Sequence, residues 1–486
     1  MDEIRDIIKI GLDFGTHQTK ICIQRTPDEG HGIPEYEFMT FVDKDGIEQY
    51  SLPSVIQINQ DDRLSYGFVV PIQEKQNSVP LPILDIVPEV EKIDRELETK
   101  QLLSKYAVGE TSQEDVDAIH YLLDRKLEIL ETKHEKLAAA EKARFESAMD
   151  NYKRNRNLFR YFKQATFAGY EWNKPIASDT LCIWYLTYII FILEKRFGTG
   201  FDINMGVPTD ERQYEMLKRH AVRILRSAFY LAEEVFEGSV EEFLSAKYQD
   251  LLEKTILLPY SEADKEEFGL NIFPEAYASL VGMTSRGKIS NGMSLNVDIG
   301  GGTTDISFFT VNDRKPMIYR YWSIPYGLNY IAESSGFDYA DSDFSSLSES
   351  EAVENYNRIK LELGQKIERE LLEMLKTSSV SKGQFLAALH DRVVIYNGGG
   401  STYEFLTVPV SHFSDVKSHD VKFWEEENIK NLKDIKPVAM LLATSYGLAV
   451  SNSDAEVELC DFESLFPKDD DGESKYERRE IDKDVC

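Results

Sequence analysis

The chain has few cysteines and few basic residues for its length. Four of its 486 residues are cysteine, and their spacing matches neither a disulfide framework nor a metal-binding motif. We therefore expect a protein of a reducing compartment, the cytoplasm. Lys and Arg number 55 against 85 Asp and Glu, so the formal net charge is −30. This charge keeps a surface soluble, and it argues against a general affinity for nucleic acid, whose binding depends on basic side chains.

Long hydrophobic runs are absent as well. The most apolar run, residues 181–193, is about two-thirds of the length that spans a bilayer. We expect a buried helix there, with a membrane or partner contact as the alternative. The first residues, MDEIRD, are acidic and lack the positively charged start of a secretory signal. A chain of 486 residues is too long for one ordinary domain, so we expect at least two lobes and no membrane span.

Two glycine-rich turns are the most informative features that are present. Residues 10–21 read IGLDFGTHQTKI, and residues 297–307 read VDIGGGTTDIS. Each pattern predicts a strand, a tight turn and a second strand. Glycine permits the sharp turn and lets backbone N–H groups approach an anion. Asp13 and Asp298, at the ends of the first strands, are placed to hold a hydrated cation. Two such hairpins facing each other would enclose a nucleoside triphosphate and its magnesium ion.

A third glycine-rich turn follows a strand at residues 393–402, VVIYNGGGST. Its bare glycines would let a flat ring lie against the backbone. In this order, the three turns resemble the phosphate 1, phosphate 2 and adenosine motifs of the actin/sugar-kinase/DnaK-type ATPase superfamily. The chain is most similar to the nucleotide-binding domain of DnaK-like chaperones of the 70-kDa heat-shock type. The resemblance implies an α/β, two-lobed actin-like ATPase fold made of duplicated ribonuclease-H-like domains.

Further segments carry the same resemblance, in the same order along the chain. They are Leu52-Pro53-Ser54, Phe162-Lys163-Gln164, residues 205–210 (MGVPTD) with Gln213, residues 273–282 (FPEAYASLVG), residues 357–363 (NRIKLEL) and residues 437–450. The chain also departs from the chaperones at several positions. His17 and Gln18 replace the residues usual in the first turn, and Ala276 replaces a proline. Asn357 and Leu361 replace a Glu and an Arg of the adenosine-contacting helix.

The resemblance implies roles for individual residues. Glu275 would orient the attacking water, and Lys163 would supply positive charge near the γ-phosphate. Asp13 and Asp298 would lie in the magnesium shell, through waters, and Thr303 would hold phosphate oxygens during catalysis. The nucleotide-binding residues would be Gly15, Thr16 and His17 in the first turn, Gly300, Gly301, Gly302 and Thr303 in the second, and Lys360, Gly398, Gly399, Gly400 and Ser401 around the adenosine. The implied cofactors are ATP or ADP and Mg²⁺.

The same comparison predicts the domain organisation. Residues 1–290 would form lobe I, completed by residues 437–451, and residues 291–436 would form lobe II. The strands predicted near the start are Ile7–Phe14, Lys20–Arg25, Glu35–Phe41 and Ser54–Asn59, and residues 176–288 would combine long helices with one short strand that ends at Gly206-Val207-Pro208. Residues 452–486 hold thirteen Asp or Glu against five Lys or Arg. We expect this segment to be an acidic, disordered tail.

Residues 87–160 are charged and rich in Glu, Lys, Leu and Ala, which predicts a long helical insertion in lobe I. Ser112-Gln113-Glu114-Asp115 is typical of a helix start. An apolar stripe follows at sevenfold spacing, consisting of Val116, Leu123, Leu130 and Leu137 with Ile119 and Leu127 beside them. The insertion would either pack on its own fold or project as an arm that binds a protein partner.

We therefore expect a DnaK-like ATPase module that binds and slowly hydrolyses ATP·Mg between its lobes and uses lobe closure to control a protein partner. Only about thirty-five residues, of acidic composition, follow Ser451, so we expect the chaperones' peptide-binding domain to be missing. Three alternatives stay open. They are an actin-like filament-forming ATPase, a small-molecule kinase of the same superfamily, and a nucleotide-binding pseudo-ATPase scaffold. No segment resembles the sugar-binding motifs of the kinases.

Overall fold

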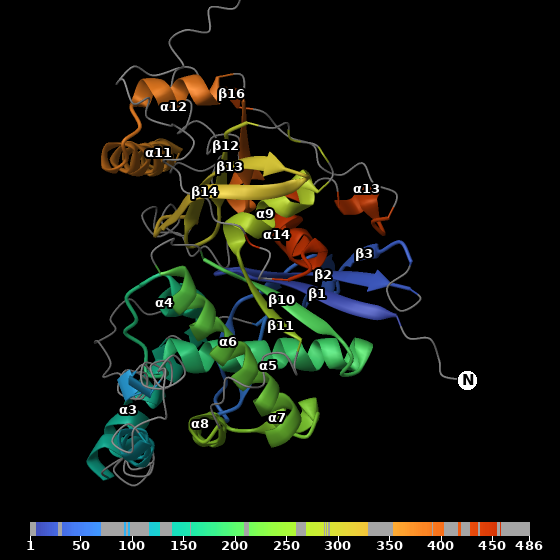
Figure 1. Ribbon diagram of the computed structural model, residues 1–486. Helices are drawn as coiled ribbons and strands as arrows, with labels where there is room; N and C mark the ends of the chain where they lie inside the picture. Colours follow the sequence, from blue (N-terminus) through green and yellow to red (C-terminus); the bar gives the residue numbers. More distant parts are fainter. Residues whose placement is uncertain are drawn as a thin grey trace, which may run out of the picture.

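A computed structural model shows how the three turns are arranged in space (Figure 1). The residues that the structure describes are 6–27, 32–69, 92–93, 96–97, 116–126, 139–155, 157–208, 213–258, 269–285, 287, 289, 292–328, 353–390, 392–402, 417–418, 428–435, 438–453 and 457. Within them the molecule is a mixed α/β structure with two large sheets and two small ones.

The first large sheet has the strand order β11-β10-β1-β2-β3. Its strands are β1 (Ile7–Phe14), β2 (Gln18–Thr26), β3 (Glu35–Phe38), β10 (Asp202–Val207) and β11 (Leu270–Pro274), and β6 (Leu52–Pro53) extends the edge beside the start of β2. β1, β2 and β3 are antiparallel, whereas β10 is parallel to β1 and β11 is parallel to β10. The second halves of β1 and β10 are buried on both faces, as expected for central strands covered by helices.

The second large sheet repeats this arrangement with the order β14-β13-β12-β15-β16. Its strands are β12 (Ser294–Ile299), β13 (Thr304–Asn312), β14 (Lys315–Ile324), β15 (Val393–Asn397) and β16 (Lys417–Ser418). Again three strands are antiparallel and two continue in parallel. The hairpins β1–β2 and β12–β13 therefore occupy equivalent places in two sheets of the same topology.

Helices α9 (Glu275–Thr284) and α14 (Ala439–Val450) pack against each other between the two sheets (Figure 1). α9 follows the first sheet in the chain but contacts β12, β13 and β14, whereas α14 follows the second sheet but contacts β1, β2 and β10. Glycines permit this packing, because a Cβ on Gly11 would lie 2.1 Å from Ser445 O and one on Gly447 would lie 1.7 Å from Ala278 O. The helix pair thus fixes how the two sheets face each other.

The outer sides of both sheets are covered by further helices. Below the first sheet in Figure 1 lie α5 (Ser178–Phe197), α6 (Tyr214–Tyr230), the π-helix η2 (Leu231–Val235), α7 (Val240–Ser245) and α8 (Tyr248–Ile256). On the second sheet, α11 (Val353–Thr377) and α12 (Lys382–Leu389) contribute to a separate core. The apolar run at 181–193 is buried within α5, which confirms the buried helix. No helix among the described residues is long and apolar enough to cross a membrane.

The predicted strands near the start are present, with two differences. The segment predicted as one strand at 35–41 is interrupted, because β3 ends at Phe38 and β4 (Phe41–Val42) pairs instead with β5 (Glu48–Gln49). The second small sheet joins β7 (Ile56–Ile58), β8 (Leu64–Tyr66) and β9 (Leu158–Phe159). The prediction of one strand within 176–288 was wrong, because β11 follows β10 in the first sheet. Five residues that end in proline carry too little periodicity to reveal a strand.

Most of the predicted insertion at 87–160 lies outside the described residues, including its predicted start at 112–115. Its final helix, α3 (Ala139–Asn155), packs on the body of the molecule, where Phe145, Met149 and Tyr152 join the main core. The Tyr152 ring stacks on Phe159, with ring centres 4.5 Å apart. At least this end of the insertion therefore packs on its own fold.

The predicted apolar stripe of the insertion is wrong at one described position. Residues 116–126 are helical, but Leu123 is 42% exposed, and its neighbour Leu122 is buried with Ile93 and Leu97. The helix face that makes the contact contains Ile119, which was predicted beside the stripe, and Leu122 in place of Leu123. Leu127, Leu130 and Leu137 lie outside the described residues, as does the tail except for 452, 453 and 457.

Candidate active site between the two sheets

The tips of the two equivalent hairpins meet. Gly15, Thr16 and His17 connect β1 to β2, and residues 300–303 connect β12 to β13. A Cβ on Gly301 would lie only 1.7 Å from His17 Cδ2, so the imidazole ring of the first hairpin rests on the bare backbone of the second. The glycine is required here for close approach rather than for an unusual backbone angle.

A pocket lies between the hairpins and reaches the third glycine-rich turn. Its lining consists of Asp13, Gly15, Thr16, His17, Gln18, Lys20, Lys163, Glu275, Asp298, Gly300, Gly301, Thr303, Asp305, Leu328, Gly398, Gly399, Leu441 and Thr444. The pocket thus brings together all the predicted catalytic residues and most of the predicted nucleotide-binding residues. Its volume is about 70 Å³, about half that of a cavity that accommodates benzene. The touching hairpin tips therefore leave little room between them.

Four predicted nucleotide-binding residues do not line this pocket. Gly302 lies in the second turn but faces Gln164, and Gly400 packs on Ile299. The Ser401 hydroxyl donates to Gly398 O at 2.7 Å, within the 3-10 turn η5 (Gly399–Thr402). Lys360 is on α11, but its side chain lies outside the described residues.

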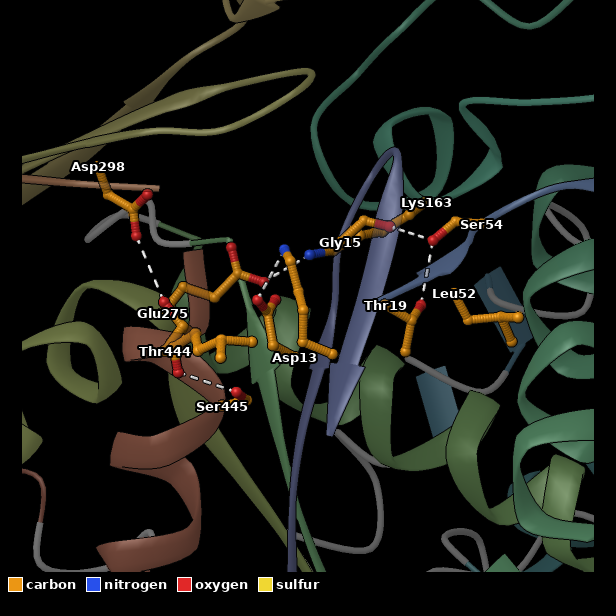
Figure 2. Close-up of polar contacts among 12 residues, drawn as sticks. Asp13, Gly15, Thr19, Leu52, Ser54, Lys163, Glu275, Asp298, Thr444 and Ser445 are labelled. Carbon is orange, nitrogen blue, oxygen red and sulfur yellow. Dashed lines mark hydrogen bonds and ion pairs between the residues drawn. The ribbon is translucent and has the colours of Figure 1, made fainter. Parts of the chain in front are cut away.

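The third turn packs directly on the second hairpin. Gly398 has a φ of +77°, a left-handed conformation that favours glycine, and a Cβ there would lie 2.3 Å from Asp298 Oδ1. Asp298 also accepts a hydrogen bond from the Thr444 hydroxyl on α14 at 3.5 Å (Figure 2). The carboxylate of Asp298 thus lies where the second hairpin, the third turn and helix α14 meet.

Two ion pairs lie on the side of the pocket formed by the first sheet (Figure 2). Lys20 Nζ is 3.0 Å from Asp13 Oδ2, and Lys163 Nζ is 2.5 Å from Glu275 Oε1. Burial opposes the charge of Lys163, but the carboxylates of Glu275 and Asp13 outweigh it and raise the pKa of the lysine. Burial also raises the pKa of Glu275, and Lys163 partly offsets this effect. Lys163 therefore stays charged and holds Glu275 in place.

Local structure explains how these two side chains reach each other. Glu275 is the first residue of α9 and follows Pro274, which has no N–H to bond and whose ring suits a chain entering a helix. Lys163 is on the short helix α4 (Phe162–Phe167). The residue before this helix, Tyr161, has a φ of +64°, which is strained for a non-glycine residue. The strained turn directs α4 towards the pocket.

The acids of the second hairpin have no lysine partner in the same hairpin. Burial raises the pKa of Asp298 well above its ordinary value, and the charges of Asp305 and Glu275 add to the effect. Burial, together with Glu275, raises the pKa of Asp305 to about 7. Asp305 Oδ2 accepts a 3.3 Å hydrogen bond from the Thr303 hydroxyl. An added positive charge would stabilise the ionised form of both aspartates.

Ser54 supports the first turn from behind. Its hydroxyl donates to Gly15 O at 2.7 Å and lies 3.1 Å from the Thr19 hydroxyl, and its N–H donates to His17 O at 2.8 Å (Figure 2). The predicted segment Leu52-Pro53-Ser54 therefore contributes a brace for the backbone of the first turn.

His17 is neutral in this arrangement. Burial lowers its pKa well below the ordinary value, and the nearby charge of Arg160 lowers it further, although a hydrogen bond with the Gly301 backbone acts in the opposite direction. Its ring also meets the Tyr161 ring edge to face, with ring centres 5.1 Å apart. A neutral ring can donate one hydrogen bond but contributes no charge towards a phosphate.

The site suits a hydrated cation better than one bound directly by protein. Among the described residues, no group of three or more His, Cys, Asp or Glu side chains is close enough to hold a metal ion. Yet the pocket holds four carboxylates (Asp13, Glu275, Asp298 and Asp305) against two lysines (Lys20 and Lys163), which leaves two negative charges if all are ionised. Mg²⁺ retains several waters and is bound through one or two carboxylates and substrate phosphates, so this donor set fits it.

Sequence reasoning missed Lys20, Asp305, Gln164 and Thr444. A signal for the first two was available, because each lies seven residues after the aspartate of its hairpin and the register places it directly opposite: Asp13 pairs with Lys20 and Asp298 with Asp305. Gln164 was noted only as a neighbour of Lys163. Nothing in a single sequence shows that Thr444 lies beside Asp298, because 146 residues separate them.

No protein-family model matches the chain, and no curated protein sequence matches it.

Proposed function

We propose that the chain is an ATPase of the actin-like, two-lobed type that binds ATP·Mg between its lobes. One observation carries the proposal. Two hairpins that occupy equivalent places in two sheets of the same topology bring their turns, their aspartates and a buried Lys–Glu pair into one pocket. Each lobe would consist of one large sheet with its outer helices, and α9 and α14 would lie between them.

Backbone N–H groups of the two turns would bind the phosphates. Gly15 and Thr16 approach the pocket from one side, and Gly300, Gly301 and Thr303 from the other. Lys20 and Lys163 supply the positive charge that phosphate oxygens require. Opening and closing of the lobes would then couple nucleotide binding to the distance between the sheets.

Glu275 is suited to orient a water for attack on the γ-phosphate. Lys163 fixes its Oε1, so the carboxylate has a defined orientation and its other oxygen can accept a hydrogen bond from water. Asp13 and Asp298 would hold the hydrated magnesium ion from the two lobes. When bound, that ion bridges the phosphates and neutralises charge that develops during transfer.

The output of the cycle would be a conformation that a protein partner recognises, as in a DnaK-like module. The partner would contact the outer parts of the lobes or the insertion at 87–160. The buried end of α3 would connect the insertion to the body of lobe I.

The test is ATP binding and phosphate release by the purified full chain. We expect magnesium-dependent binding by calorimetry and slow phosphate release. Glu275→Gln should retain binding and lose about 100-fold or more of the single-turnover rate. Glu253→Gln, an exposed position on α8, is the matched control and should change neither. Binding without release would indicate a pseudo-ATPase, ATP-dependent pelleting would indicate a filament, and no binding by the unaltered chain would overturn the proposal.

A further inference from the structure

A buried hydrogen bond crosses from α4 to the second hairpin. Gln164 Nε2 donates to Gly302 O at 2.8 Å, and the Gln164 side chain is almost fully buried. The fit is close, because a Cβ on Gly302 would lie 2.5 Å from Gln164 Oε1. Helix α4, on the first-sheet side of the pocket, therefore binds the turn of the second hairpin directly beside Lys163.

His17 makes a second contact of the same kind. Its ring hydrogen-bonds to the Gly301 backbone and lies where any side chain on Gly301 would collide with it. Tyr161 holds the ring by an edge-to-face contact. Gln164 and His17 thus engage two consecutive residues of the second turn from the first-sheet side.

These contacts join a side whose carboxylates are paired with lysines to a side whose carboxylates have no lysine in their own hairpin. Asp13 and Glu275 belong to the first-sheet side, and Asp298 and Asp305 to the second. Closing such a site without a cation is opposed by repulsion between carboxylates. Direct contacts between the hairpins have to supply part of the stabilisation of the closed form.

We propose that Gln164 and His17 form a latch that holds the two turns together and must open before a nucleotide enters or leaves. Gln164 is then a positioning residue, because it acts on the phosphate-binding turn through Gly302 O. The inference rests on the proposed function only for the identity of the ligand. The latch itself consists of contacts within the chain and can be tested without any ligand.

The first test measures the distance between the lobes in nucleotide-free protein. Spin labels are placed at Lys195, at the end of α5, and at Lys376, near the end of α11, which are both exposed. The background carries Cys460→Ser and Cys486→Ser. We expect Gln164→Leu, which keeps the bulk but removes the donor, to shift the distance distribution towards longer values. Gly302→Ala breaks the same contact from the other side and should cause the same shift.

Thr255→Val is the matched control. It removes a partly buried hydrogen bond of 2.8 Å, which Trp184 Nε1 donates to the Thr255 hydroxyl. Both residues are on helices that cover the first sheet, α5 and α8. Its distance distribution should equal that of the unaltered chain even if its melting temperature falls. Unchanged distributions in both folded latch variants would overturn the latch.

The second test measures release of a fluorescent ADP analogue after a chase with excess ATP. Loss of one net hydrogen bond should accelerate release in Gln164→Leu by about 2- to 12-fold. An unchanged release rate would overturn the gating role. If the unaltered chain does not bind the analogue, the proposed function fails, and the label distances alone decide whether the latch exists.

Discussion

The β1–β2 and β12–β13 hairpins have the same topology and opposite electrostatics. In the first, Asp13 faces Lys20 across the strands and forms an ion pair of 3.0 Å. In the second, Asp298 faces Asp305, and the pKa of both acids is raised by burial and by neighbouring carboxylates. The first hairpin is thus neutralised within itself, whereas the second requires positive charge from elsewhere.

The glycines of the two turns also differ in what surrounds them. A Cβ on Gly15 would lie 2.3 Å from Gln18 O in its own hairpin, whereas a Cβ on Gly301 would meet His17 of the other. Gly15 is therefore constrained by the backbone of its own turn, whereas Gly301 and Gly302 of the second turn are constrained by what lies across the pocket. The difference indicates that the first hairpin is stabilised by its own contacts. The second hairpin depends on bound cations and on contacts from the other side of the pocket.

The largest effect should come from removing the acid that lacks a partner in its own hairpin. Asp298→Asn is expected to lower the single-turnover rate of ATP hydrolysis by about 100-fold to 1000-fold, because it weakens cation binding where no lysine compensates. Asp313→Asn, at an exposed turn of the same sheet, is the matched control. An Asp298→Asn rate within a factor of three of that control would refute the assignment.

The second effect concerns pH and the metal-free protein. A folded pKa of about 7 for Asp305 means that the folded state holds a proton which the unfolded state has lost, so stability falls as pH rises towards 7. Between pH 5.5 and 8 this group should cost about 2 kcal/mol of unfolding free energy. Urea unfolding in EDTA should show that loss in the unaltered chain and not in Asp305→Asn. Equal pH slopes for the two proteins would contradict the prediction.

The two glycine substitutions should have different consequences. Gly15→Ala places a methyl group against backbone of its own turn, so we expect a loss of about 1–3 kcal/mol in unfolding free energy. Gly301→Ala should instead push the hairpins apart, with a smaller loss of stability and a longer distance between the labels on α5 and α11. Urea unfolding and the spin-label distances separate the outcomes. Identical behaviour of the two variants would show that the turns are not constrained differently.

The smallest effect should appear in the magnesium requirement. Asp305→Asn removes one carboxylate near the cation and should raise the magnesium concentration needed for half-maximal ATP binding by about 10-fold. Lys20→Met leaves Asp13 unpaired and should lower that concentration while weakening ATP binding itself. Calorimetric titrations at several magnesium concentrations measure both. If the magnesium concentration for half-maximal ATP binding shifted in the same direction in both variants, the proposed electrostatic difference between the hairpins would be contradicted.

Sequence patterns predicted the parts of this arrangement that are encoded locally. The hairpins, the buried helix at 181–193 and the turn at residue 398 each follow from a short run of residues whose glycines and apolar periodicity have one physical interpretation. The charge difference between the hairpins was also local, since Lys20 and Asp305 follow their aspartates by seven residues. It was missed because the register that places them opposite was not used.

Other features depend on contacts between distant segments. The hydrogen bond from Gln164 to Gly302 spans 138 residues, and neither local sequence indicates the other. β11 was missed for a related reason, because its five residues are a strand only through pairing with β10. The predicted stripe on the insertion failed at Leu123 because a sevenfold pattern does not determine which helix face finds a partner.

The position of α14 has a consequence for how the protein is made. The face of the first sheet around Gly11 is covered by a helix that begins at Ala439, although the last strand of that sheet ends at Pro274. At the usual rates of ribosomal synthesis, the intervening 164 residues take about 10 to 30 s. During that interval the first sheet has one bare apolar face. The nascent chain is then most vulnerable to aggregation, and the two halves cannot mature as independent units.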